Sequence, residues 1–266
     1  MARPLWRVTS ACEIGTSHLG SGTSCQDSAA SCILRTKEGP VLVAVVCDGA
    51  GSAVHSAIGS WLASNTFVEL VEVHFENGGH LVDIDRDKVV GWITNTAERL
   101  TNRALEVGNA PKDYSCTLLA AIVGNDAAVF AQIGDGAIVV NHGEADGWSW
   151  VFWPQHGEYA NQTMFILSAT AAASLEFSLA PRRIDEFAIF SDGIERMVLH
   201  GASKAVNDPF FNQMFIPVRA SRARGLDIEL SQKLKAYLGS AVVNSRTNDD
   251  KTLLMATRRP RTKVIA

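Results

Sequence analysis

No stretch of the 266-residue sequence approaches the roughly 20 uncharged apolar residues that a membrane-spanning helix needs. The first ten residues also lack the short apolar run of a secretory signal peptide. The five cysteines are scattered and include no CxxC pair, which argues against a disulfide framework and against a zinc site. These absences predict a cytoplasmic protein with reduced thiols and no association with a membrane.

Positive charge is not in excess either, because 24 Lys and Arg stand against 28 Asp and Glu, a net charge of −4. A surface that neutralises nucleic-acid phosphates is therefore not expected. Neither GxSxG nor HExxH occurs, which counts against an α/β serine hydrolase and against a zinc protease. These absences leave a soluble enzyme or a protein-binding module as the classes to consider.

Apolar residues make up 47% of the chain, enough to bury a sizeable core. Alternating and continuous apolar runs predict strands at 6–13, 27–34, 41–47, 116–123, 127–133, 137–141, 148–153, 186–190 and 251–257. Helical spacing predicts helices at 53–75, 85–107, 209–220 and 226–238, the second capped by Asp85 or a neighbour. The order of these elements indicates an α+β fold in which helices cover a β-sandwich. No linker divides the chain, so residues 1–266 are expected to form one domain.

Acidic residues recur where the predicted strands end. Asp48, Asp135 and Asp192 each follow an apolar strand and precede glycine, while Asp249 stands just before the last strand and Asp27 opens the second. A strand fixes its terminal carboxylate, and glycine lets the backbone approach an ion closely. Mg²⁺ and Mn²⁺ prefer such oxygen ligands, and converging aspartates can hold two ions. Any one Asp-Gly pair alone is usually only a turn.

The whole set, in order, resembles the type 2C family of metal-dependent protein phosphatases, including its divergent bacterial branch. The matching segments are QD at 26–27, VAVVCDGAGS at 43–52, SCTLLAAIV at 115–123, IGDG at 133–136, QHGEYANQT at 155–163, FSDGIE at 190–195 and DDKT at 249–252. The resemblance runs from about residue 9 to residue 257. It implies a central antiparallel β-sandwich flanked by helix pairs, in agreement with the pattern of elements.

Carried over to this sequence, the resemblance implies two Mn²⁺ or Mg²⁺ ions. Asp48 would bridge both ions and the Gly49 carbonyl would bind one, while Asp192 and Asp249 would bind the other. Asp27 would orient the water that bridges the ions and attacks phosphorus. Asp113 lies where many relatives hold a third, labile ion, although a plain surface role is the alternative.

The sequence departs from the family at three places. Gly22 occupies the position of the arginine that usually grips the phosphate. The last motif reads Asp-Asp rather than Asp-Asn, so Asp250 competes with Asp249 as the ligand. Ser115-Cys116 replaces smaller residues before Thr117. His18, in the predicted turn at 15–24, is either a phosphate contact or an exposed turn residue, and Asp135 is expected to tie a turn rather than to bind metal.

The expected function is hydrolysis of phosphoserine and phosphothreonine in a phosphorylated protein substrate, with a cognate serine/threonine kinase as a candidate partner. A catalytically weak phosphatase that binds phosphoproteins as a regulator is the alternative that the missing arginine leaves open. A nucleotide-binding enzyme that uses residues 48–51 as a phosphate cradle is disfavoured, because the loop lacks a complete GxGxxG and a Walker lysine.

Overall fold

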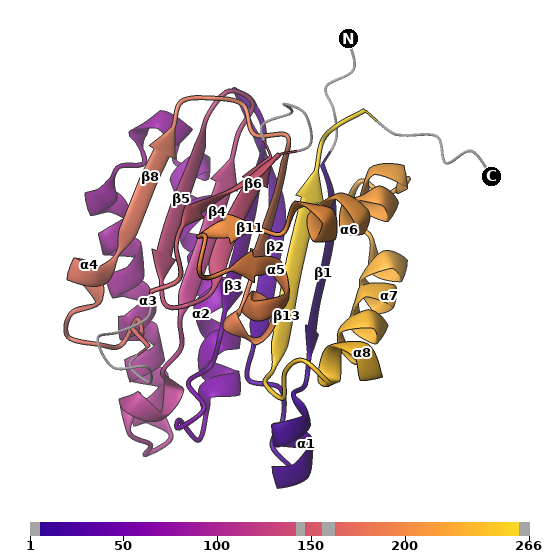
Figure 1. Cartoon of the computed structure of the whole chain (residues 1–266). Coiled ribbons are helices and arrows are strands. Elements are labelled where there is room, and N and C mark those ends of the chain that lie inside the picture. The colour runs from indigo at the N-terminus through magenta and orange to yellow at the C-terminus, as the bar shows by residue number, and fades with distance from the viewer. Residues whose placement is uncertain (1–5, 142–146, 156–162, 261–266) are drawn as a thin grey trace.

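Two stacked β-sheets form the centre of the molecule in a computed structural model that describes residues 6–141, 147–155 and 163–260 (Figure 1). The six-stranded sheet has the order β12 (Gly225–Leu226), β1 (Arg7–Glu13), β13 (Lys251–Thr257), β9 (Glu186–Phe190), β6 (Ala137–Asn141) and β7 (Trp148–Phe152). The five-stranded sheet has the order β2 (Ser28–Thr36), β3 (Gly39–Cys47), β4 (Leu118–Val123), β5 (Ala128–Ile133) and β8 (Glu176–Ala180). Neighbouring strands are antiparallel except for β1 and β12. A separate hairpin joins β10 (Leu199–His200) and β11 (Ala205–Val206).

Helices cover the outer face of each sheet (Figure 1). The long helices α2 (Ser56–Glu76) and α3 (Arg86–Glu106) lie on the five-stranded sheet, whereas α6 (Asp208–Ala220) and α7 (Ile228–Leu238) lie on the six-stranded sheet. Shorter helical segments are α1 (Thr16–Ser21), η1 (Leu81–Asp83), η2 (Pro111–Tyr114), α4 (Ala171–Ser174), η3 (Asp192–Ile194), α5 (Glu195–Val198) and α8 (Ala241–Asn244). The predicted α+β sandwich flanked by helix pairs is confirmed.

Strand β3 shows why its sequence is continuously apolar. Val43 and Val45 pack under the α2–α3 layer, while Ala44 and Val46 pack between the two sheets. Both faces of the strand are therefore buried, so a polar residue at any position along it would have to be buried at a cost in stability. A third core, around Phe211 and other aromatic residues, joins the six-stranded sheet to α6 and α7.

Several segments differ from the sequence-based prediction. Residues 16–21 form α1 rather than a turn, and Gly22 ends that helix in the left-handed conformation with φ of 71°. Residues 176–180 form the edge strand β8, where the sequence predicted no strand. The Asp85 cap is confirmed, because its side chain accepts a hydrogen bond of 2.8 Å from the Lys88 N–H. Residues 156–162 of the predicted QHGEYANQT motif lie outside the described residues.

No helix among the described residues combines the length and the apolar character needed to cross a bilayer.

Candidate active site

Strand register brings the first two predicted aspartates together. Ser28 at the start of β2 pairs with Cys47 at the end of β3. Their neighbours, Asp27 and Asp48, therefore leave the sheet side by side. The Asp48 loop is fixed by Thr117, whose N–H donates to the Asp48 carbonyl and whose Oγ1 accepts from the Asp48 N–H, both at 2.8 Å.

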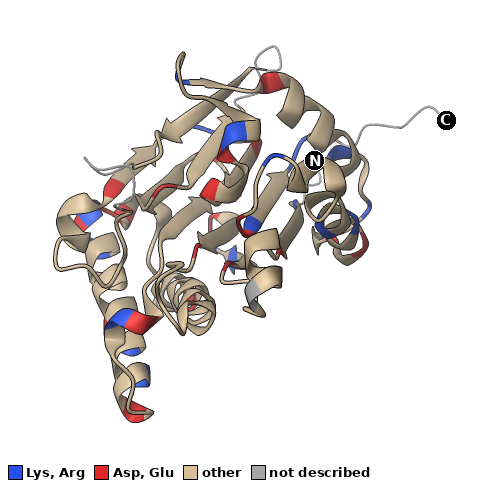
Figure 2. Cartoon of the chain, turned by 60° about the horizontal axis from the view of Figure 1, so that its bottom comes forward, with Lys and Arg blue, Asp and Glu red and all other residues tan. Residues whose placement is uncertain are grey.

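The other sheet supplies the remaining aspartates by the same logic. Phe190 at the end of β9 pairs with Ala137 of β6 on one side and with Leu253 of β13 on the other. The turns that adjoin these paired residues carry Asp135, Asp192 and Asp249. Figure 2, which brings this end of the sandwich forward, shows acidic segments where the strands end. The pairing of the strands thus brings these acidic turns to one end of the sandwich.

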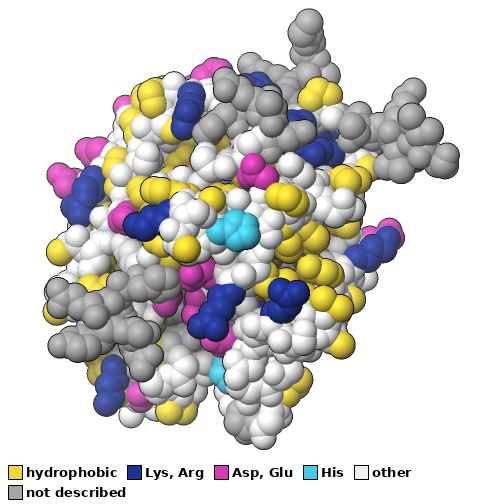
Figure 3. All heavy atoms as spheres, in the orientation of Figure 1, with side chains coloured by type: hydrophobic (Ala, Val, Ile, Leu, Met, Phe, Trp, Pro, Cys, Tyr) yellow, Lys and Arg dark blue, Asp and Glu magenta, His cyan; other side chains and the backbone are white. Residues whose placement is uncertain are grey.

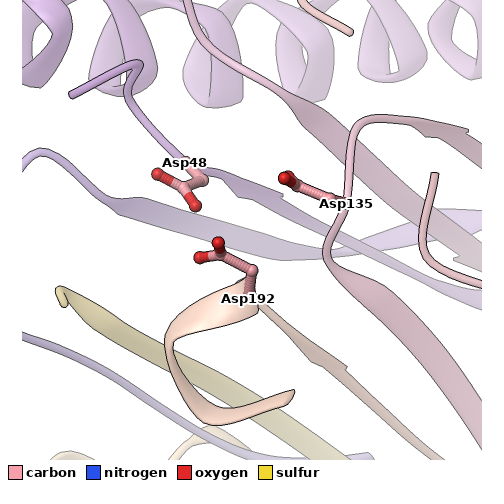
Figure 4. Close-up of side chains that lie close together, drawn as sticks. All are labelled: Asp48, Asp135 and Asp192. Atoms are coloured by element: carbon pink, nitrogen blue, oxygen red, sulfur yellow. The ribbon is translucent and has the colours of Figure 1, made fainter. Parts of the chain in front are cut away.

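Three carboxylates form the centre of the group. One oxygen from each of Asp48, Asp135 and Asp192 lies within 4.8 Å of the others, and their side chains point toward one another (Figure 4). The prediction that Asp135 serves only to tie a turn is incomplete. Its Oδ2 does accept a 2.6 Å hydrogen bond from Thr163 Oγ1, but the same carboxylate also belongs to the cluster.

Glycine is required beside two of these carboxylates. A Cβ on Gly49 would lie 2.6 Å from the Gln26 carbonyl oxygen, and one on Gly193 would lie 1.8 Å from the Asp250 carbonyl oxygen. No larger residue fits either position without moving the backbone. The two glycines therefore allow the acidic loops of different strands to touch.

Asp27 is buried next to the cluster and joins the two sheets. Its Oδ2 accepts a hydrogen bond of 2.7 Å from Ser191 Oγ. Its Oδ1, like Gln26 Oε1, is buried and has no hydrogen-bond partner among the described residues. Buried acceptors without donors are costly, so an ion or its water is the expected partner here. The donor set is entirely oxygen, which suits Mg²⁺ or Mn²⁺.

The adjacent side chains of Asp249 and Asp250 have different environments and different roles. Asp250 is buried, and its carboxylate accepts hydrogen bonds from the Gly15 N–H at 2.6 Å and the Gln26 N–H at 2.5 Å. Asp249 is exposed and lines the same pocket as Asp48 and Asp192. The geometry therefore favours Asp249 as the ligand and Asp250 as the residue that ties the N-terminal segment to β13.

His18 lies in this pocket and is not an exposed turn residue. Its side chain is 18% exposed, and Nδ1 lies 2.9 Å from Asp250 Oδ1. The pocket, about 120 Å³ in volume, has His18 as its one basic side chain among the described residues. Asp250 thus orients the imidazole beside the acidic cluster, and a role in contacting phosphate stays a prediction.

Asp113 stands apart from the three-carboxylate group. It lies in η2, and its backbone carbonyl accepts a hydrogen bond of 2.8 Å from the His55 N–H. Among the described residues the cluster consists of Asp48, Asp135 and Asp192 without it. Its part in binding a third ion stays a prediction.

Burial and mutual repulsion disfavour ionisation of Asp27, Asp48 and Asp192. Burial is the largest cause for each of these three residues, raising the pKa of Asp27 to about 6 and that of Asp192 to about 7. The pKa of Asp48 lies well above its usual range, first because of burial and then because Asp27 and Asp192 repel its charge. Several carboxylates held together at this cost are what a site for divalent cations requires.

The family described as "Protein phosphatase 2C" matches this chain over residues 14–239. The chain belongs to the protein phosphatase 2C family. It is 34% identical to "Serine/threonine-protein phosphatase 3" of Escherichia coli (strain K12) over 252 residues, which cover 94% of this chain and 98% of that protein.

Solved structures share the phosphatase 2C fold with this chain. A crystal structure of a bacterial serine phosphatase has a TM-score of 0.61 at 16% identity, covering 97% of this chain and 99% of that one. The serine/threonine phosphatase Stp1 from Staphylococcus aureus has a TM-score of 0.56 at 17% identity, covering 94% of each chain. At these identities the likeness establishes the fold alone.

The raised pKa values predict how stability depends on pH in the metal-free phosphatase. A carboxylate whose pKa is raised by folding destabilises the protein increasingly as pH rises from its unfolded value toward its folded one. In protein treated with a chelator, the ionisation of Asp27 and Asp192 should therefore lower Tm as pH rises from the unfolded pKa of 3.8 through their folded values of about 6 and about 7. Each kcal/mol lost from the free energy of unfolding lowers Tm by about 2–4 °C in a chain of this size.

Calorimetry with chelator and with saturating Mn²⁺ checks this expectation. Mn²⁺ should raise Tm more at pH 8 than at pH 5.5, because ions bind the deprotonated carboxylates. Asp192→Asn should flatten the pH dependence of the chelated protein. A Tm of the chelated wild type that rises with pH across this range would contradict the account of the cluster.

Proposed function

We propose that the acidic residues at this end of the sandwich hold two divalent cations, Mn²⁺ or Mg²⁺, and that the site hydrolyses phosphoserine and phosphothreonine in proteins. The chain is a metal-dependent serine/threonine phosphatase, in accord with its family and with its 34%-identical relative. The observation that carries the proposal for the site is the convergence of Asp48, Asp135 and Asp192 within 4.8 Å. Every member of this group is an oxygen donor at the end of a rigid element.

In this proposal Asp48 and the Gly49 carbonyl bind one ion, and Asp48, Asp192 and Asp249 bind the other. Divalent cations held in this way neutralise phosphoryl charge and lower the pKa of a water molecule. Asp27 offers its unpaired Oδ1 as the acceptor that orients the attacking water, while Ser191 fixes the other oxygen. Asp135, held by Thr163, adds a further carboxylate to the same group. A third ion at Asp113 belongs to the proposal as an addition that the main site does not need.

Turnover of a phosphoserine peptide tests the proposal. Activity should appear with Mn²⁺, vanish with a chelator in excess, and return when Mn²⁺ is restored. A phosphopeptide that binds with micromolar affinity but is not hydrolysed at any Mn²⁺ or Mg²⁺ concentration would instead favour the regulator that only binds phosphoproteins. Asp48, Asp135, Asp192 and Asp249 line one pocket, which supports hydrolysis rather than binding alone.

His18→Ala is expected to weaken substrate binding more than turnover. His18 lines the pocket beside Asp48 and Asp192, and Asp250 orients its ring. Loss of an imidazole donor to the phosphate should raise KM several-fold with kcat little changed. Steady-state kinetics at saturating Mn²⁺, with His74→Ala on α2 as the matched control, measure this split. An unchanged KM would mean that His18 contacts Asp250 but does not contact the substrate phosphate.

We further propose that the protein acts in the cytoplasm on phosphorylated proteins, with a cognate serine/threonine kinase as its counterpart. We also propose that residues 1–266 form one phosphatase domain. The continuity of the three cores, which share the same two sheets, supports that reading.

A further inference from the structure

A second pocket adjoins the acidic one. It has a volume of about 210 Å³, and Asp192 and Asp249 line both pockets. Arg196 and Arg246 line only the second pocket, whereas Asp48 lines only the first. The carboxylates of Asp192 and Asp249 thus separate the two arginines from the centre of the acidic cluster.

The two arginines come from different parts of the chain and are held by ordered elements. Arg196 lies on α5, directly after η3, which begins with Asp192. Arg246 follows α8, where its N–H donates a 2.8 Å hydrogen bond to the Val243 carbonyl, and Val243 is buried. Their common pocket is therefore a product of the fold and not of neighbouring positions in sequence.

Both guanidinium groups are free to receive a ligand. Arg196 and Arg246 are exposed, and neither side chain makes an ion pair or a hydrogen bond with any residue that the structure describes. Other arginines around the sandwich are engaged, for example Arg219 and Arg258 with Glu186 and Asp185. Figure 3 shows dark blue basic side chains beside a recessed magenta acidic group on this face.

We propose that Arg196 and Arg246 form a subsite for a second anionic side chain of the substrate, close in sequence to the phosphoserine that is hydrolysed. The guanidinium fork binds carboxylate and phosphate alike, through charge-assisted hydrogen bonds. Aspartate, glutamate or another phosphoserine would each fit this chemistry. The subsite would make the phosphatase selective for acidic or multiply phosphorylated segments.

The inference rests on the proposed function. Without cations in the first pocket, Asp192 and Asp249 would repel an anion bound in the second. With the cations bound, their charge is neutralised and the arginines set the local potential. The reacting phosphoryl group itself is assigned to the first pocket, near His18, because Asp48 and Asp135 line that pocket only.

Selectivity between matched peptides tests the subsite. Four phosphoserine peptides differ only in the residues flanking the phosphoserine, which are alanine, glutamate, a second phosphoserine or lysine. At saturating Mn²⁺ the wild type should show a kcat/KM for the glutamate and doubly phosphorylated peptides about tenfold or more above the alanine peptide. In Arg196→Ala/Arg246→Ala this ratio should fall to about one to two, and in Arg196→Glu/Arg246→Glu the lysine peptide should become preferred.

A change in the first pocket would alter kcat/KM for all four peptides alike, because the same cations act on each of them. The ratio of kcat/KM between two peptides is therefore insensitive to such a change. Arg222→Ala/Arg224→Ala removes the same charge from an exposed loop between α6 and β12 and should keep the wild-type ratio. Selectivity that survives in Arg196→Ala/Arg246→Ala, or a wild type that treats the alanine and anionic peptides equally, would overturn the subsite while leaving the phosphatase intact. A wild type that hydrolyses none of the peptides with Mn²⁺ would overturn the proposed function and the subsite together.

Discussion

Asp48→Asn is expected to lower kcat by about a thousandfold or more. Asp48 is the carboxylate assigned to both ions, and it lies within 4.8 Å of Asp135 and Asp192. Asparagine keeps the shape of the side chain but removes the charge that holds a cation. Stabilisation by bound cations amounts to several kcal/mol in the transition state, and each 1.36 kcal/mol is tenfold in rate.

Steady-state kinetics over a wide range of Mn²⁺ concentration measure this loss. Asp87→Asn, an exposed aspartate in the first turn of α3, is the matched control and should retain wild-type activity. Because the charge of Asp48 is unfavourable in the empty site, Asp48→Asn should also stabilise the chelated protein. Retention of more than a few per cent of activity at full metal saturation would refute the assignment of Asp48 as the bridging ligand.

Asp249→Ala and Asp250→Ala should impair different properties, metal binding in the first variant and stability of the fold in the second. Asp249 is exposed and lines the acidic pocket, so its loss should weaken Mn²⁺ binding and activity at least a hundredfold with little change in Tm. Asp250→Ala should instead destabilise the fold by about 3 kcal/mol, because the Gly15 and Gln26 N–H groups would lose their buried charged acceptor. Metal titration and thermal unfolding of both variants separate the two effects.

Asp250→Asn is the control for the second variant, since it restores one oxygen acceptor and the asparagine that the family usually has. Its loss of stability should be smaller than that of Asp250→Ala. If Asp250→Ala proved the worse variant in Mn²⁺ binding while it remained folded, the register of the DDKT motif would be shifted by one residue.

Much of this site was predictable because its residues stand at the ends of strongly patterned strands. Strands β9 and β13 have the bounds that the sequence predicted, since both are apolar runs stopped abruptly by polar residues. Strand pairing then forces the neighbouring aspartates together, although spacing along the chain does not specify which strands pair. The family resemblance supplied that missing information.

Other features depend on tertiary contacts that leave little trace in sequence. Helix α1 carries no apolar periodicity and is held by its contacts with the Asn248 carbonyl and Asp250. In the sequence, Asp135 has the pattern of an ordinary Asp-Gly turn residue. Its place in the carboxylate cluster depends on how the two sheets stack. The pocket of Arg196 and Arg246 joins segments 50 residues apart in sequence, so only the folded chain brings the two side chains to one surface. Most arginines in proteins are exposed, so an arginine in the sequence does not by itself indicate a ligand-binding site.

Counting bound ions while activity is measured tests the central claim most directly. Equilibrium dialysis with Mn²⁺, followed by metal analysis and assay of the same samples on a phosphoserine peptide, relates occupancy to turnover. The account predicts that wild-type protein binds at least two ions per chain, that activity rises with their occupancy, and that Asp48→Asn loses both. Full activity in exhaustively chelated protein, or turnover by Asp48→Asn that equals wild type, would contradict it.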